Sequence, residues 1–177
     1  MERMYLLKDP WKLASPREAA RFALTNAVIA AVVPECSTLL EVGSGEGMQT
    51  EALLKVSRAV TGIEVSMAAV ERAHRAVPAA EFITGRAEDA QTLLGTRRFD
   101  LVTACEVLYY APDVEHVLTT LQSLAPRILV TSYEKRARRL SRHLEGPGWT
   151  RLEDMQAYGM RWWCYLWQAP GRLQPVG

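Results

Sequence analysis

A glycine-rich segment that follows an acidic residue is the part of the sequence with the clearest capacity to bind a ligand. Residues 39–47 read LLEVGSGEG, so the pattern G-x-G-x-G begins two positions after Glu41. Glycines permit a tight turn and let a ligand approach the main chain. Nicotinamide and flavin sites more often have the spacing G-x-G-x-x-G, and the Glu41 carboxylate would repel their phosphates. The segment favours a ligand with an ammonium group, and a glycine turn without a ligand is the alternative.

A second acidic residue, Glu64, ends the next predicted strand, 23 residues after Glu41. In nucleotide-binding sheets a carboxylate in this position accepts hydrogen bonds from the hydroxyl groups of a ribose. The alternative is a solvated acidic residue at the end of a strand. Because Glu41 and Glu64 occur together at this spacing, we favour the ribose role.

A third acidic residue, Glu106, follows the fourth predicted strand and precedes Tyr109 and Tyr110. The carboxyl ends of parallel strands meet at one edge of a sheet, where open α/β folds bind their ligands. Glu106 could hold an ammonium group there or accept its proton. The alternative is a contact between Glu106 and a backbone amide beside the ligand. We expect one of the two tyrosines to face the pocket and the other to face the core.

The elements that must position these residues alternate between strand and helix. A first helix is predicted to begin at Pro16, with Ser15 as its cap and Glu18 completing a capping box, and to run to about Val33. Strands are predicted over residues 37–42, 59–65, 81–84, 99–104 and 127–131, and helices over residues 46–57, 66–78 and 112–124. This alternation predicts a doubly wound, mostly parallel α/β sheet with helices on both faces.

The C-terminal part departs from this alternation. Residues 134–144 predict a very basic helix. Residues 149–158 and 160–167 are two strand-like runs separated by Gly159, which predicts an antiparallel hairpin. With the hairpin, the predicted sheet has seven strands.

The composition of the chain suits one domain over residues 1–177. Hydrophobic residues make up 49% and charged residues 23%, as is typical of globular proteins, and a net charge of +1 demands no polyanionic partner. The longest apolar stretch, residues 27–34, is far too short to span a membrane, and the N-terminal residues do not form a signal peptide. Three separated cysteines fit neither a disulfide framework nor a metal motif, so we expect reduced thiols, no metal site and a cytoplasmic location.

Taken together, these motifs resemble the class I S-adenosylmethionine-dependent methyltransferases. The resemblance is carried by residues 41–47, 63–66, 99–102 and 105–110. A narrower likeness, to the small N-methyltransferases of the nodulation protein S type, is carried by Asp9-Pro10-Trp11 and by residues 106–110. The resemblance implies S-adenosyl-L-methionine as cofactor, S-adenosyl-L-homocysteine as product, and a Rossmann-like core over residues 37–169 behind an N-terminal lid segment and helix over residues 1–34.

The resemblance also implies a set of site residues. The expected cofactor-binding residues are Trp11, Glu41, Gly43, Ser44, Gly45, Gly47, Glu64, Val65, Arg86, Ala87, Glu88 and Cys105, and the expected catalytic residues are Glu106, Tyr109 and Tyr110. One position departs from the family pattern, because Arg86 stands where many members have the aspartate that holds the adenine amine. The main chain at Ala87 can still reach the adenine, and Glu88 or Asp89 could supply the carboxylate.

The expected activity is methyl transfer to a small-molecule nucleophile, with an amine favoured over a hydroxyl. An RNA or protein methyltransferase and a non-catalytic cofactor-binding module are the alternatives. The basic residues 133–143 could clamp an acidic substrate or touch nucleic acid, although a solvated helix face is the commoner explanation. We expect neither a nucleic acid nor a membrane partner. Tyr5 and Trp11 could form an aromatic lid over the cofactor.

Overall fold

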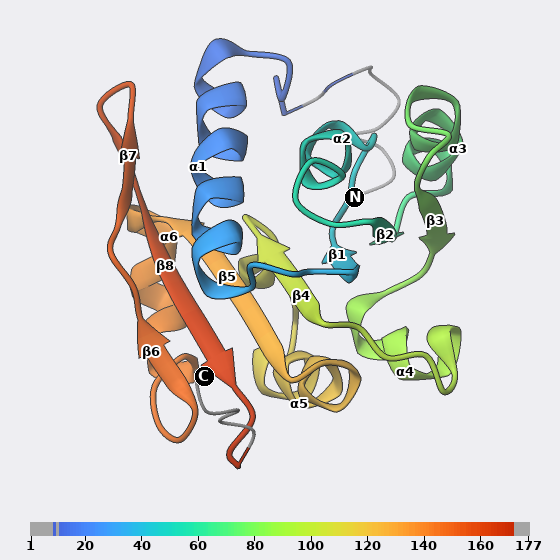
Figure 1. Ribbon diagram of the computed structural model, residues 1–177. Helices are drawn as coiled ribbons and strands as arrows, with labels where there is room; N and C mark the ends of the chain where they lie inside the picture. The colour runs from blue at the N-terminus through green and yellow to red at the C-terminus, as the bar shows by residue number, and fades with distance from the viewer. Residues whose placement is uncertain (1–8, 10, 172–177) are drawn as a thin grey trace.

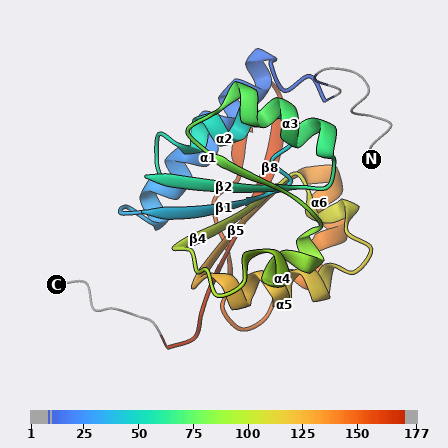
Figure 2. The ribbon, with the colours of Figure 1, turned by 90° about the vertical axis from the view of Figure 1, so that its right-hand side faces the viewer.

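A single eight-stranded sheet, covered by helices on both faces, forms the centre of the molecule (Figures 1 and 2). The computed structural model describes residue 9 and residues 11–171. The strands are β1 (Thr38–Val42), β2 (Ala59–Glu64), β3 (Glu81–Thr84), β4 (Leu101–Cys105), β5 (Arg127–Tyr133), β6 (Trp149–Arg151), β7 (Met155–Ala157) and β8 (Met160–Gln168).

The helices form two layers. One face of the sheet carries α1 (Pro16–Val32), α2 (Met48–Leu53) and α3 (Met67–Ala76), and the other carries α4 (Ala90–Leu94), α5 (Val114–Leu124) and α6 (Glu134–Leu140) (Figure 2). Separate groups of buried apolar side chains join each layer to the sheet, with Ile29 and Leu53 on the α1 side and Leu121 and Leu140 on the α5 side. Within the described residues, no helix combines the length and the apolar character needed to cross a membrane.

The order of the strands confirms the predicted fold class. The first five strands are parallel and lie in the order β3-β2-β1-β4-β5, and β8 then pairs antiparallel with β5. Strands β6 and β7 both pair antiparallel with β8. Strands β2 and β3 extend the sheet on one side of β1, and β4 and β5 extend it on the other side. A change of side of this kind is the switch point where doubly wound sheets bind ligands.

The predicted count of seven strands was wrong because the run over residues 149–158 is broken. Arg151 pairs with Tyr165 and Met155 pairs with Trp162. The chain therefore advances four residues on this side while β8 advances three. The extra residue makes a bulge, and the Asp154 carboxylate there accepts hydrogen bonds from the Arg151 guanidinium. The run therefore divides into β6 and β7. The predicted turn at Gly159 does connect β7 to β8.

Three predicted helix details also need correction. The Ser15 side chain caps α1 by accepting a hydrogen bond from the Glu18 amide at 3.4 Å, but the Glu18 carboxylate binds arginine side chains instead of completing a capping box. Helix α2 is shorter than residues 46–57, because Gly47 caps its start in a left-handed conformation and residues 54–56 form turns. Helix α6 ends at Leu140, and residues 141–143 form a 3₁₀ turn.

Candidate active site

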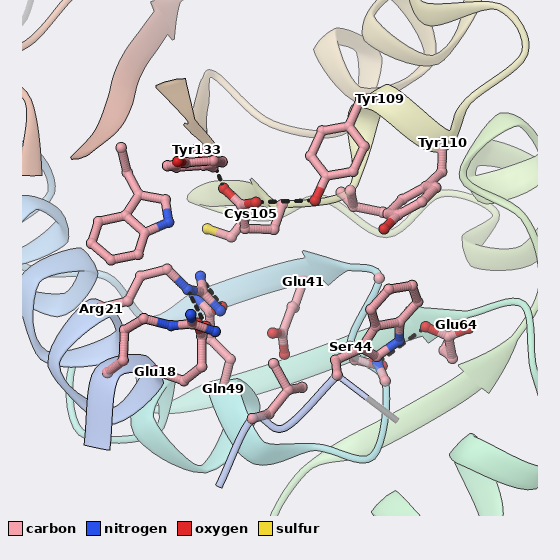
Figure 3. A pocket seen from close by; sticks show the side chains of 18 of the residues that line it. Glu18, Arg21, Glu41, Ser44, Gln49, Glu64, Cys105, Tyr109, Tyr110 and Tyr133 are labelled. Carbon is pink, nitrogen blue, oxygen red and sulfur yellow. Dashed lines mark hydrogen bonds and ion pairs between the residues drawn. The ribbon is translucent and has the colours of Figure 1, made fainter. Parts of the chain in front are cut away.

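Two adjoining cavities open at the edge of the sheet where β1, β2 and β4 end. Figure 3 shows side chains that line the first of them. They share Gly43, Glu64, Val107 and Tyr110 as a common wall. The first cavity, of about 220 Å³, extends toward α1 and the end of β5. The second cavity, of about 310 Å³, extends toward the turn after β3. A ligand that lies along these four shared residues would therefore reach into both cavities.

The glycine turn after β1 brings the main chain against the first cavity. Gly43 and Gly45 line it and have φ angles of 76° and 54°, a region that favours glycine. A Cβ atom on Gly43 would lie 2.6 Å from Cγ2 of Val107, so a side chain there would push into the common wall. Ser44 also lines the cavity, and its buried hydroxyl has no hydrogen-bond partner among the described residues. The hydroxyl lies against β2, 2.7 Å from where a Cβ atom on Gly62 would be, so the turn presents its main chain to the cavity.

Gly47 is the one predicted site residue that lines neither cavity. It lies behind the turn, where it begins α2 with a φ angle of 87°. A Cβ atom on Gly47 would lie 3.2 Å from the side chains of Val77 and Phe82. The glycine at this position therefore permits close packing between α2, α3 and β3.

Glu64 lies in the common wall at the end of β2. Its carboxylate accepts hydrogen bonds from the main-chain amides of Gly45 and Ser66, each at 3.1 Å. Burial raises the pKa of this carboxyl, although both hydrogen bonds oppose the shift. The carboxylate therefore ties the glycine turn to the start of α3 and lies at the junction of the two cavities.

Glu41 lies deeper in the first cavity, at the end of β1 (Figure 3). Only 3% of its surface is exposed, and its carboxylate accepts a hydrogen bond from the Thr50 hydroxyl of α2. Burial raises the pKa of Glu41 to about 7, with the Thr50 hydrogen bond and the charge of Arg21 acting in the opposite direction. A cationic ligand group beside Glu41 would relieve the cost of burying this carboxylate.

Helix α1 contributes a buried ion pair to the same cavity. Arg21 is 3% exposed and donates from Nε to Glu18 at 2.7 Å and from Nη1 to the Gln49 side chain at 2.9 Å. All three residues line the cavity, and Figure 3 shows Arg21 and Glu18 reaching in from α1. None of the three is predicted as a site residue from the sequence, because their placement depends on how α1 packs against the sheet. Arg21 gives the cavity a cationic group opposite its carboxylates.

Glu106 is held in a strained backbone conformation at the end of β4. Its φ angle is 58°, which is uncommon for a residue other than glycine. Its carboxylate accepts hydrogen bonds from the Tyr109 hydroxyl at 3.0 Å and from the main-chain amide of Tyr133. Burial raises its pKa, against the charge of Arg21 and both hydrogen bonds. Glu106 thus makes the backbone contact that was the alternative to a catalytic role, and it also lines the first cavity.

The two tyrosines after Glu106 both line the first cavity, so neither is confined to the core. Tyr109 also packs against the core, and burial followed by the Glu106 charge raises the pKa of its hydroxyl. Tyr110 is 41% exposed and lies between Tyr109 and Trp11, with ring centroids 4.5 and 5.8 Å away. The three rings form an aromatic row across the cavity mouth. Tyr5, the other predicted lid residue, lies outside the described residues.

The second cavity holds the residues expected near an adenine. Val65, Arg86, Ala87 and Glu88 line it. Arg86 donates from Nη2 to the Glu88 carboxylate at 2.9 Å, so the residue that departs from the family pattern is paired with a neighbouring acid. That ion pair is largely exposed, which limits its contribution to stability. The opposite wall is apolar, with Leu108 and Val117.

The cysteines do not form a reactive cluster within the described residues. Cys36, Cys105 and Cys164 are buried free thiols. Cys105 lines the first cavity, and burial raises the pKa of its thiol. Within the same part of the chain, no three histidine, cysteine, aspartate or glutamate side chains are grouped to hold a metal ion.

Comparison with known proteins agrees with this geometry. The crystal structure of the N-methyltransferase NodS from Bradyrhizobium japonicum, in complex with S-adenosyl-L-homocysteine, matches with a TM-score of 0.74. The match covers 96% of each chain at 20% sequence identity, which shows that the two proteins share a fold.

The sequence comparisons show the family. Nodulation protein S of Rhizobium tropici is 32% identical over 131 residues, covering 71% of this chain and 55% of the relative. The protein of the same name from Bradyrhizobium diazoefficiens is 30% identical over 125 residues, covering 70% of this chain and 59% of the relative. The chain thus spans a little over half the length of these curated relatives. The family model of nodulation protein S matches residues 1–134, and the chain belongs to that family.

Proposed function

We propose that this chain binds S-adenosylmethionine and transfers its methyl group to a small-molecule nucleophile, with an amine favoured over a hydroxyl. The observation that carries the proposal is the pair of cavities joined at Glu64, with Glu41 on one side of the junction and Val65 and Ala87 on the other. This arrangement suits an elongated ligand with an amino acid at one end and a nucleoside at the other. The related structure that contains S-adenosyl-L-homocysteine supports the same choice.

The polar groups of the first cavity fit the amino acid end of this cofactor. Glu41 would face its ammonium group and Arg21 its carboxylate. In the common wall, Glu64 would accept hydrogen bonds from the ribose hydroxyls, while Val65, Ala87 and Glu88 would hold the adenine. Bound S-adenosylmethionine supplies a methyl group already activated by its sulfonium. The chain's own tasks are alignment, proton removal and the exclusion of water.

Glu106 is placed to handle the proton of an acceptor amine. Burial raises its pKa above that of an exposed glutamate, which makes the carboxylate a stronger base. In the ionised form it attracts an ammonium group, and by accepting one proton it leaves a neutral, nucleophilic amine. The Tyr109 hydroxyl and the Tyr133 amide fix the orientation of the carboxylate during this exchange. The aromatic row of Trp11, Tyr110 and Tyr109 would exclude water from the cavity mouth.

Calorimetry with S-adenosylhomocysteine and with NADH tests the cofactor assignment. We expect micromolar binding of S-adenosylhomocysteine and no measurable binding of NADH. Binding of NADH without S-adenosylhomocysteine would refute the assignment. Transfer of labelled methyl groups to a panel of amines and alcohols then tests the reaction, and cofactor binding without any transfer would favour a non-catalytic binding module.

A further inference from the structure

A third cavity lies next to the first one, on the face of the sheet that carries α5 and α6. We call it the basic groove. One wall consists of Arg136 and Arg139 from α6 together with Arg142 and His143 from the following turn, and the other consists of residues 111–115. The proposed cofactor site uses none of the three arginines or His143, although Ala111 and Pro112 also line the second cavity.

Tyr109 connects the basic groove to the first cavity, because it lines both. Its hydroxyl donates to Glu106 at 3.0 Å, while the guanidinium carbon of Arg136 lies 5.1 Å from the centre of its ring. One aromatic side chain therefore separates the proposed base from the first arginine of the groove. A molecule with its nucleophile at Glu106 would have to extend past this ring to reach the groove.

The arginines of the groove differ from their neighbour on the same helix. Arg138, which does not line the groove, pairs with Glu134 at 3.1 Å. Arg136 and Arg139 have no carboxylate within ion-pair distance among the described residues. Their spacing of three residues along a helix places like charges side by side, which costs stability. An anion between them would remove this repulsion.

The acidic residues of the groove are already engaged. The Asp113 carboxylate caps α5 by accepting from the His116 amide at 3.0 Å. Glu115 lies 3.3 Å from His143 at the rim. Three arginines, Arg136, Arg139 and Arg142, line the groove against these two carboxylates, which leaves a net positive charge for an anionic ligand. A planar guanidinium with several N–H donors matches the oxygens of a carboxylate, sulfate or phosphate.

We propose that the basic groove binds an anionic group of the methyl acceptor, a carboxylate, sulfate or phosphate, while the acceptor's nucleophile lies at Glu106. The inference rests on the proposed function, since it takes the first cavity as the place of methyl transfer. It gives the acceptor two recognised ends, one cationic or nucleophilic and one anionic, with the ring of Tyr109 between them.

Titration with inorganic phosphate, followed by nuclear magnetic resonance of the full chain, tests the groove alone. We expect saturable shifts centred on residues 108–116 and 136–143. Arg139→Gln should weaken this binding by about fivefold or more, since it removes a charged hydrogen-bond donor. Arg138→Gln is the matched control, because it removes an arginine of the same helix outside the groove, and it should leave the binding unchanged. Shifts that never saturate, or equal losses in both variants, would overturn the inference.

A series of amines tests the link to the acceptor. Aminoalkanes are compared with ω-aminoalkanoates and ω-aminoalkyl phosphates of increasing length, as substrates with S-adenosylmethionine. We expect the anionic members to have a kcat/KM about tenfold higher at the matching length, the size of one charged contact. The advantage should vanish in Arg139→Gln and persist in Arg138→Gln, with equal rates for the neutral amines. No anionic advantage, or salt-dependent RNA binding that Arg139→Gln abolishes, would overturn the inference. If the unmodified chain does not bind S-adenosylhomocysteine, the proposed function is refuted. The phosphate titration tests the groove whatever that result is.

Discussion

The two halves of the site hold their carboxylates in different ways. On the side of the glycine turn, Glu64 is held by the main-chain amides of Gly45 and Ser66, within 19 residues along the chain. On the opposite side, Glu106 is held by Tyr109 and by the main chain of Tyr133, which is 27 residues away and ends strand β5. The first arrangement joins two strands that are consecutive in the chain, β1 and β2, whereas the second also depends on β5, which follows β4 only after α5. We therefore expect substitutions to separate the halves, with cofactor binding affected on one side and turnover on the other.

The largest effect is expected from Glu106→Gln. The substitution keeps the shape of the side chain and its ability to accept from the Tyr133 amide, but it removes the base. Turnover should fall by about 10²–10⁴-fold, the range typical of acid–base catalysis, while the Kd for S-adenosylhomocysteine stays nearly unchanged. Both quantities should be measured on the same preparation.

Two outcomes would contradict the assignment of Glu106. Loss of cofactor binding would place Glu106 with the cofactor-binding residues and remove the contrast between the halves. Normal turnover would mean that alignment alone drives the reaction. Tyr109→Phe is a useful companion, because it removes a hydrogen bond to Glu106 and leaves the carboxylate in place.

The next effect is expected on the cofactor side. Glu64→Ala should weaken S-adenosylhomocysteine binding by about 1–3 kcal/mol, the range for hydrogen bonds to a charged group. Isothermal titration measures the change, and thermal melting shows whether the turn still folds. Glu81→Gln is a suitable control. Glu81 begins β3, at the edge of the sheet opposite to the one where Glu64 ends β2, and it pairs with Arg97 at the surface. An unchanged Kd in Glu64→Ala would mean that the ribose binds elsewhere.

The affinity for the cofactor should also depend on pH, through Glu41 on the side of the glycine turn. The pKa of Glu41 is raised to about 7, so in the free protein the carboxyl becomes protonated as the pH falls below that value. Only the ionised form attracts an ammonium group, so affinity for S-adenosylhomocysteine should fall by up to about tenfold per pH unit below pH 7 and level off above it. Calorimetry between pH 5.5 and 8 tests this expectation. In Glu41→Gln the affinity should be lower and its pH dependence flat, and an equal slope in both proteins would assign the titration to another group.

The smallest effect is expected at the cavity mouth, where the two halves meet. Trp11→Ala should weaken S-adenosylmethionine binding by about two- to fivefold, which corresponds to a cation–π contribution of about 0.5–1 kcal/mol. S-adenosylhomocysteine, which has no sulfonium charge, should lose less. Tyr158→Ala removes an exposed aromatic ring that lines neither cavity and serves as the control. Equal losses for both ligands would assign Trp11 a packing role.

The same contrast explains what the sequence could predict. Ser44, Glu41 and Glu64 follow from short patterns, because a glycine turn after one strand and an acid at the end of the next are placed by local geometry. The alternation of strands and helices likewise gave the fold class. The bulge that divides β6 from β7 was missed, since an extra residue in a strand becomes visible only when its pairing with β8 is known.

The residues that sequence reasoning missed are those placed by long-range packing. Arg21 lies in the interior of a helix, and only the docking of α1 brings it to Gln49, 28 residues away. Tyr133 contributes a main-chain amide, a group that every residue except proline carries and no motif can mark. For the basic segment, a solvated helix face was the favoured interpretation and a clamp for an acidic substrate or a contact with nucleic acid the alternative. Its link to Tyr109 depends on the packing of α6 against the turn after β4.

The left-handed backbone at Glu106 sets stability and activity against each other at a single position. Glycine and asparagine adopt a φ angle of 58° with less strain than glutamate. A library of variants selected only for folding should therefore enrich these two residues at position 106. A library selected for methyl transfer should keep glutamate there and accept the strain. The residue at position 106 would then show whether selection for stability or selection for activity has prevailed.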